Sequence, residues 1–312
     1  MMKQSFAKVG VGRLCKLFGR TRHAFYEKSW YKQQRYSNEQ VVVELLIALK
    51  QEIPLQSTKS IYLILKPTLL THGITIGRDS LHQIRERYNL LNRPRKRYYK
   101  TTDSFHRFHK YPNRIKDLSI TAIEQVWVCD ITYIRVVHEF NFLSLITDAY
   151  SHLIVGYCLH ETLAAEGSLK ALKMAISTLK ENTRGLIHHS DRGIQYCCDQ
   201  YTGELKKYNI ESSMTENGDP YENAIAERLN GILKHNFQLE QIFSSRDHAL
   251  QVVDRAIKNY NHLRPHQSVS MLTPANAHQY PGELKRCWKS KPYKARDHPD
   301  IASNEAEQDA SV

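Results

Sequence analysis

The run 126–137 limits the possible folds of this chain more than any other segment. It is rich in β-branched and aromatic residues, with polar side chains at Asp130 and Thr132, which is typical of a β-strand. Short turns separate it from strand-like runs at 142–147 and 152–159, so we expect an antiparallel meander of three strands.

Helical and strand patterns alternate after this meander. A helix is expected at about 165–180, a short strand at 186–189, and further helices at 222–236 and 245–262. This order predicts an α/β domain in which helices cover a sheet.

The charge is divided unevenly along the chain. Residues 1–120 contain 24 Lys and Arg against 8 Asp and Glu, whereas residues 121–312 contain 20 against 24. The net charge of +12 therefore comes from the first part, which we expect to bind a polyanion such as nucleic acid. The hydrophobic share of 41% is that of an ordinary globular protein and excludes a wholly disordered chain.

Residues 1–90 are expected to form an all-α DNA-binding region of the helix-turn-helix type. Two short helical segments within 11–28 are separated by Gly19, and the second begins at about residue 21. Arg20 and Arg22 stand at the start of this second helix and are candidate DNA contacts.

Three further helices are expected in the same region, at about 39–50, 59–72 and 79–88. Pro67 falls inside one of them and should kink or divide it, because proline removes a helical hydrogen bond.

Residues 91–120 form a basic linker or arm. Cations strongly outnumber acids in this stretch, and tyrosines and phenylalanines are interleaved with them. A solvated linker would explain such a charge run, but the aromatic residues favour an extended arm lying along DNA phosphates. The candidate DNA contacts in it are Arg93, Arg95, Lys96, Arg97 and Lys100.

Neither a membrane span nor a signal peptide is expected, because no apolar run has the required length. The six cysteines lack the spacing of a zinc site and are expected to be free thiols in a reducing cytoplasm. The polar tail 283–312 is expected to be disordered.

Three acidic residues in the second part of the chain stand where a charge needs a reason. Asp130 interrupts an apolar strand, Asp191 directly follows a short strand, and Glu227 lies on a predicted helix. Thirty-five residues separate Asp191 from Glu227, and Lys234 follows Glu227 after seven residues, on the same helical face. An acid that holds a metal and a lysine that holds a phosphate could therefore share one groove.

Four sequence motifs around these acids resemble those of a known family. They are D-x-T-Y at 130–133, H-S-D-x-G-x-Q-Y at 189–196, the segment 213–227, and Y-N-x-x-R-P-H with a following L-T-P at 260–274. In this order they resemble the catalytic protein (OrfB type) of the IS-three (IS3) family of insertion-sequence transposases, whose core is similar to that of retroviral integrases.

The resemblance implies a ribonuclease-H-like integrase core at 121–282, in which a mixed five-stranded sheet is flanked by helices. Asp130, Asp191 and Glu227 would be catalytic and hold two Mg²⁺ or Mn²⁺ ions, and Lys234 would contact DNA. The reaction would be strand cleavage and strand transfer at the ends of a mobile element. His188 and His189 are expected to pack or to face DNA, because Mg²⁺ prefers oxygen ligands.

The implied partners are the inverted-repeat ends of the element and the target DNA. Two ends must be held together, so the resemblance implies at least a homodimer. It also allows a fusion with, or a partner from, an upstream reading frame. The implied location is the bacterial cytoplasm, in association with the nucleoid.

Three other functions stay open on the sequence. A ribonuclease-H-like nuclease would use the same acids but never join strands. A DNA-binding regulator would keep the fold of the core without its catalytic activity. A structural chromatin-type protein would need only the basic part, and the acidic part of the chain would then have no function.

Overall fold

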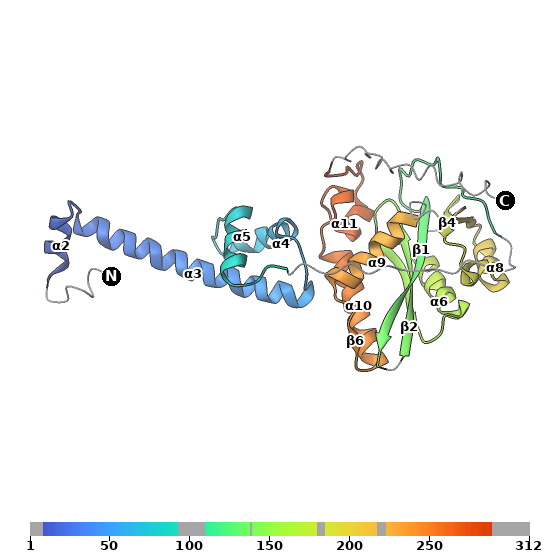
Figure 1. The fold of residues 1–312 in the computed structure, drawn as a ribbon. Helices are drawn as coiled ribbons and strands as arrows, with labels where there is room; N and C mark the ends of the chain where they lie inside the picture. The colour runs from blue at the N-terminus through green and yellow to red at the C-terminus, as the bar shows by residue number, and fades with distance from the viewer. Residues whose placement is uncertain (1–8, 93–109, 138, 180–184, 217–222, 289–312) are drawn as a thin grey trace, which may run out of the picture.

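The computed structural model describes residues 9–92, 110–137, 139–179, 185–216 and 223–288 (Figure 1). The tail beyond residue 288 lies outside these ranges, as do the candidate DNA contacts of the arm: Arg93, Arg95, Lys96, Arg97 and Lys100. None of the helices within these ranges is long and apolar enough to cross a membrane.

A mixed sheet forms the centre of the second part of the chain. Its strands follow the order β3–β2–β1–β4–β5, and the two-residue β6 also pairs with β1. The pairs β1–β2 and β2–β3 are antiparallel, as the expected meander requires, whereas β4 and β6 run parallel to β1 and β5 runs parallel to β4. The strands are β1 (Val126–Val136), β2 (Glu139–Asp148), β3 (Ile154–His160), β4 (Ile187–Ser190), β5 (Glu211–Met214) and β6 (Ile242–Phe243). The expected mixed five-stranded sheet is confirmed, with β6 added to it.

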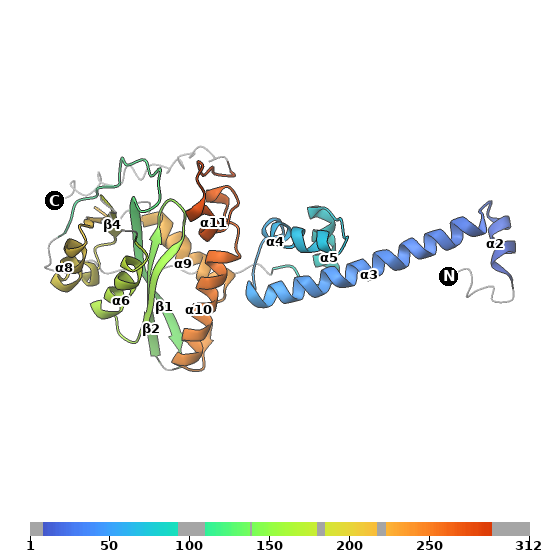
Figure 2. The same cartoon turned by 180° about the vertical axis from the view of Figure 1, so that it is seen from behind.

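Helices cover both faces of this sheet (Figures 1 and 2). One face carries α6 (Ala165–Ile176), α7 (Ile194–Cys197) and α8 (Asp199–Lys207), and the other carries α9 (Ala224–Asn236) and α10 (Arg246–His262), with α11 (Pro274–Gln279) beside α10. Side chains of β1 alternate between the two faces, as expected for a strand. Trp127 and Cys129 join the core under α6 and α8, whereas Ile134 and Val136 join the core under α9 and α10.

The chain before the sheet is helical, as expected, but its helices differ from the expected ones. It contains α2 (Val11–Leu17), α3 (Arg22–Glu52), α4 (Thr58–Thr71) and α5 (Arg78–Arg87). The separate helices expected at about 21–28 and 39–50 are one helix of 31 residues, and that expectation was wrong. The sequence contains no Gly or Pro between residues 22 and 52, so nothing breaks the helix there. Thr21 caps its start by accepting a hydrogen bond from the backbone N–H of Ala24 (3.1 Å).

Pro67 does not divide helix α4, which continues from Thr58 to Thr71. The missing proline N–H costs one helical hydrogen bond, but Ile61, Leu65 and Leu69 are buried along one side of the helix. This tertiary packing holds the helix together across the proline.

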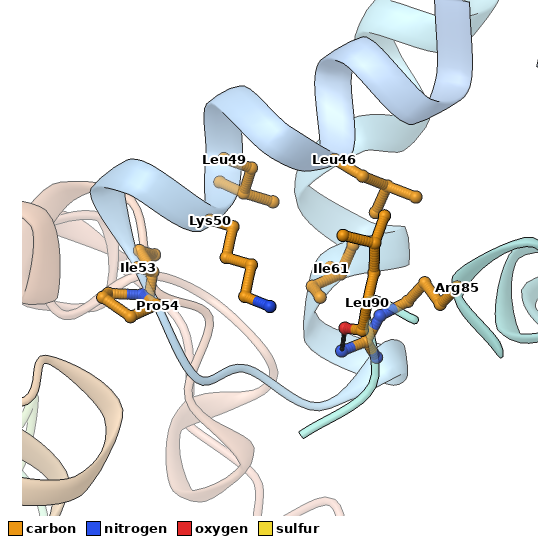
Figure 3. Close-up of a pocket in the computed structure, with 8 residues that line it drawn as sticks. All are labelled: Leu46, Leu49, Lys50, Ile53, Pro54, Ile61, Arg85 and Leu90. Carbon is orange, nitrogen blue, oxygen red and sulfur yellow. Dashed lines mark hydrogen bonds between the residues drawn. The ribbon is translucent and has the colours of Figure 1, made fainter. Parts of the chain in front are cut away.

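Helices α4 and α5 pack against the second half of α3 and enclose a small pocket (Figure 3). The buried guanidinium of Arg85 faces this pocket and donates hydrogen bonds to Thr58 Oγ1 (2.6 Å) and to the carbonyl oxygen of Leu90 (3.1 Å). Arg85 therefore fixes the chain at the point where the basic arm begins, and it does not present its charge to solvent.

The end of α3 is attached to the α/β domain. The backbone N–H of Leu55 donates to the carbonyl oxygen of Asn236 (3.1 Å), and Asn259 Nδ2 donates to the carbonyl oxygen of Glu52 (3.1 Å). One hydrophobic core continues from Val42 of α3 to Tyr260 of α10. The first half of α3 extends away from this core, towards α2 (Figure 1).

The close contact between β3 and α6 leads to a prediction about Gly156. A Cβ added to this residue would overlap the carbonyl oxygen of Ala171 and lie 2.9 Å from Ala175 Cβ. We expect Gly156→Ala to lower the free energy of unfolding, measured in urea, by about 1–3 kcal/mol. Gly203→Ala in α8 is the control, because a Cβ there meets no atom within 4 Å. An equal loss in both variants would contradict this close contact.

Candidate active site

Asp130 is the acid that the fold places most firmly. It is the fifth residue of β1 and only 9% exposed. The alternation along β1 turns its side chain to the face covered by α9. Its Oδ1 accepts a hydrogen bond from the backbone N–H of Ile131 (2.9 Å), and its Oδ2 accepts one from Asn230 Nδ2 of α9 (2.6 Å). The buried charge is therefore held by two donors on either side of the carboxyl group.

Asp191 lies close to Asp130, in the turn directly after β4. Its Oδ1 accepts a hydrogen bond from the backbone N–H of Gly193 (3.0 Å), which fixes the turn. Burial raises the pKa of the Cys129 thiol well above its usual value, and the negative charges of Asp130 and Asp191 both raise it further. Burial also raises the pKa of Tyr196, and the charges of Asp191 and Asp130 contribute to this rise. The two aspartates expected to act together are thus brought together.

Glu227 lies on α9 between two anchors of that helix to β1. Asn223 Nδ2 donates to the carbonyl oxygen of Cys129 (3.0 Å), and Asn230 binds Asp130. The Glu227 carboxylate itself is exposed and makes no hydrogen bond or ion pair within the described part of the chain. The fold therefore brings the backbone of Glu227 to the side of β1 that carries Asp130, and its carboxylate is exposed there.

The candidate DNA contacts lie in two places. Lys234 is half-buried on α9, about two helical turns after Glu227. Both residues lie within this one helix, so their spacing of seven puts them on the same helical side, as expected. Arg20 and Arg22 are exposed at the turn between α2 and α3, at the end of α3 that is far from the sheet (Figure 1). The structure does not bring these two arginines to the acids.

Comparison with known proteins identifies the class of this chain. Two sequence families, both described as integrase core domain, match residues 121–220 and 208–274. The IS600 uncharacterized 31 kDa insertion-element protein of Shigella sonnei is 32% identical over 268 residues, which are 84% of this chain and 96% of that protein. The IS3A transposase InsF of Escherichia coli K12 is 32% identical over 160 residues, 51% of this chain and 55% of that protein.

The chain belongs to the IS3 family of insertion-sequence transposases. It is therefore an enzyme of the transposase and integrase class, a polynucleotidyl transferase, as the motifs predicted. Among solved structures, the magnesium-bound integrase core of HTLV-2 covers 50% of this chain and 97% of its own, with 19% identity and a TM-score of 0.40. The integrase core of BIV covers 50% and 94%, with 16% identity and a TM-score of 0.40.

The donor atoms around the two aspartates fit a hard cation such as Mg²⁺. In addition to the carboxylates, Asn230 Oδ1 is buried and has no hydrogen-bond partner among the described residues. Oxygen atoms of this kind are the ligands that Mg²⁺ prefers. The described ranges contain no group of three or more His, Cys, Asp or Glu side chains arranged for a metal.

The two asparagines of α9 were missed by the sequence reasoning. Asn223 and Asn230 stand four residues before and three residues after Glu227, which places all three on one side of the helix. Both asparagines are buried. The spacing of these two amide side chains around a candidate catalytic acid was the signal in the sequence. It could have predicted that both asparagines lie on the side of the helix that faces the acids of the sheet.

His188 lies on the opposite face of the sheet from Asp130. Its Nε2 is 2.8 Å from Cys129 Sγ and 2.8 Å from the hydroxyl of Tyr201, and all three residues are buried. Burial, with a smaller contribution from the neighbouring His189, lowers the pKa of His188 to about 3. His189 is also buried and contacts Ser213 Oγ (2.9 Å). Of the two expected roles, packing is therefore confirmed for both histidines.

The neutral, buried state of His188 predicts a pH dependence of stability. An unfolded chain protonates this histidine below about pH 6.5, whereas the folded chain does so only near pH 3, so acidification favours unfolding between these values. Between pH 7 and pH 5.5 the free energy of unfolding should fall by about 1 kcal/mol through His188. His188→Gln should remove this part of the pH dependence in urea unfolding. His262→Gln, at an exposed position of α10, should keep it.

Proposed function

We propose that this transposase cuts DNA strands at the ends of its insertion sequence and joins the freed 3′-hydroxyl to a second phosphodiester. The observation that carries the proposal is the placement of Asp130 in β1 and of Asp191 directly after the neighbouring parallel strand β4, where Val128 pairs with His189, with Asp130 buried and oriented by Asn230. Two Mg²⁺ or Mn²⁺ ions held by Asp130, Asp191 and Glu227 would activate the attacking oxygen and neutralise charge on the phosphate.

The hydrogen bonds of the site prepare these carboxylates for such a role. Asp130 Oδ1 accepts a hydrogen bond from Ile131 and Oδ2 accepts one from Asn230, which fixes the carboxylate in one orientation, and carboxylate oxygens are ligands that Mg²⁺ prefers. The bond from Gly193 to Oδ1 fixes the orientation of the Asp191 carboxylate in the same way. Glu227 completes the set by a rotation of its exposed side chain, since its helix is already anchored to β1 through Asn223.

The proposed partners are the inverted-repeat ends and the target DNA, held by at least two copies of the chain. The positive charge of residues 1–120 supports DNA binding, because neutralising phosphates is the main source of affinity. An upstream-frame protein or fusion is a further proposed partner. The proposed place of action is the bacterial cytoplasm at the nucleoid, which agrees with six unpaired cysteines.

Substitution of the acids tests the chemistry. We expect Asp130→Asn, Asp191→Asn and Glu227→Gln each to reduce Mg²⁺-dependent cleavage and joining at least 100-fold while duplex binding is retained. The assay follows a labelled element end on a sequencing gel, which separates cut products from joined ones.

The control is Asp199→Asn, an exposed acid at the start of α8, which should keep full activity. Full activity in any one of the three site variants would contradict its role as a metal ligand. Cutting by the wild type without any joined product would favour the nuclease, and binding without cutting would favour the regulator.

Removal of charge from the arm tests its role in binding. Deletion of residues 1–120 would uncover the core shared by α3 and α10, so we replace only the five cations of the arm: Arg93, Arg95, Lys96, Arg97 and Lys100. With all five changed to Gln, the slope of log K against log salt should become shallower by about 4.5 for duplex DNA, if each cation contacts one phosphate. An unchanged slope in fluorescence anisotropy would show that the arm does not lie along phosphates.

A further inference from the structure

A cluster of arginines and histidines lies outside the three carboxylates and has no role in the chemistry above. It brings together the Y-N-x-x-R-P-H motif, the start of α9, the turn between β2 and β3, and the last described segment of the chain. Its members are Arg228, Arg264, Arg286, His152 and His266, which we call the basic cluster. Arg264 and His266 belong to the motif, and the other three residues come from three further parts of the chain.

His266 is the centre of this cluster. It is only 7% exposed, and neither of its ring nitrogens has a hydrogen-bond partner in the described part of the chain. Its ring stacks on that of His152, with the centroids 4.9 Å apart and the planes at 11°. The ring of Tyr260 meets His266 edge-on at 6.0 Å. A buried imidazole without a partner is costly, so this residue needs a ligand.

The arginines around His266 also have no anionic partner. Within the described ranges none of Arg228, Arg264 and Arg286 forms an ion pair with an acid, and Arg264 Nε is buried without a hydrogen bond. Burial, with contributions from the charges of Arg264 and Arg228, lowers the pKa of His266 to about 2. Burial likewise lowers the pKa of His152 to about 4, with contributions from Arg286 and Arg264. Like charges gathered in this way favour an anion between them.

The backbone around the cluster is fixed rather than loosely exposed. The N–H of His266 donates to the carbonyl oxygen of Leu272 (2.8 Å), and the N–H of Cys287 donates to the carbonyl oxygen of Gln267 (2.8 Å). Asn261 bonds both the N–H and the carbonyl oxygen of Ile154 (3.0 Å each), which attaches the end of α10 to β3. These bonds set the places of His266 and Arg286 before any ligand arrives, as a preformed site requires.

We propose that the basic cluster binds one backbone phosphate of the DNA that the carboxylates cut. Arg228 directly follows Glu227 on α9, so a strand lying at the acids passes beside the cluster. Arginine forks match phosphate oxygens in a bidentate manner, and Arg228 and Arg286 are exposed, so a phosphate can reach both. The identification of the anion as DNA phosphate rests on the proposed function, whereas the presence of an anion site rests on the cluster alone.

Binding measured without metal tests this proposal separately from catalysis. Fluorescence anisotropy of a labelled element-end duplex in EDTA, between 50 and 200 mM salt, would compare Arg228→Gln and Arg286→Gln with the wild type. Both arginines are exposed, so their replacement leaves the core intact. Each variant should bind about tenfold more weakly, with a salt slope shallower by about 0.9, the value for one lost phosphate contact.

Arg255→Gln is the matched control, since Arg255 is an exposed arginine of α10 outside the cluster. If Arg228→Gln and Arg286→Gln weaken binding no more than Arg255→Gln, the cluster does not hold a DNA phosphate and the proposal is wrong. A wild type that binds DNA in EDTA but never cuts it with Mg²⁺ would contradict the proposed function and leave this binding test valid.

Discussion

The hydrogen bond from Asn230 to Asp130 is the interaction on which the site depends. A buried carboxylate is costly, and this bond of 2.6 Å, with the one from Ile131, offsets the loss of water. The same bond attaches α9 to β1, together with the bond from Asn223 to the Cys129 carbonyl. The charge of Asp130 therefore determines where the helix that carries Glu227 lies. A substitution of Asn223 or Asn230 would therefore displace Glu227, although the side chains of both asparagines bond to β1 and not to that residue.

The alternation of side chains along β1 separates chemistry from packing. Asp130 faces α9, where its carboxylate meets polar groups, whereas Cys129 faces α6 and α8 and contacts His188. A slip of one residue in the pairing of β1 would exchange these two sides and bury the carboxylate in the apolar core. The long antiparallel pairing of β1 with β2, from Trp127 to Val136, excludes such a slip. The register of the sheet therefore determines that Asp130 lies on the face of the active site.

The sequence predicted what depends on local pattern, and it failed where distant contacts decide. The meander, the order of elements and the two aspartates follow from strand patterns and motif spacing. The unbroken α3 was missed because the middle of this segment is polar and shows no helical hydrophobic pattern, although no Gly or Pro interrupts it. Pro67 was expected to kink or divide α4; it does not divide the helix, because burial of one side of the helix outweighs the lost bond. The exposed side chain of Glu227 is a rotamer, which spacing along a helix cannot specify.

The same limit applies to charge. A sum over residues 121–312 is slightly acidic, and on that number alone the second part of the chain has no reason to hold DNA. The fold replaces this sum with positions: Glu227 and Arg228 are consecutive on α9, and their side chains leave the helix about 100° apart. One therefore belongs with the carboxylates and the other with His266 and Arg264. A cutting site must gather carboxylates for its metal ions and must also bind a polyanion, and adjacent acidic and basic residues on one helix meet both needs.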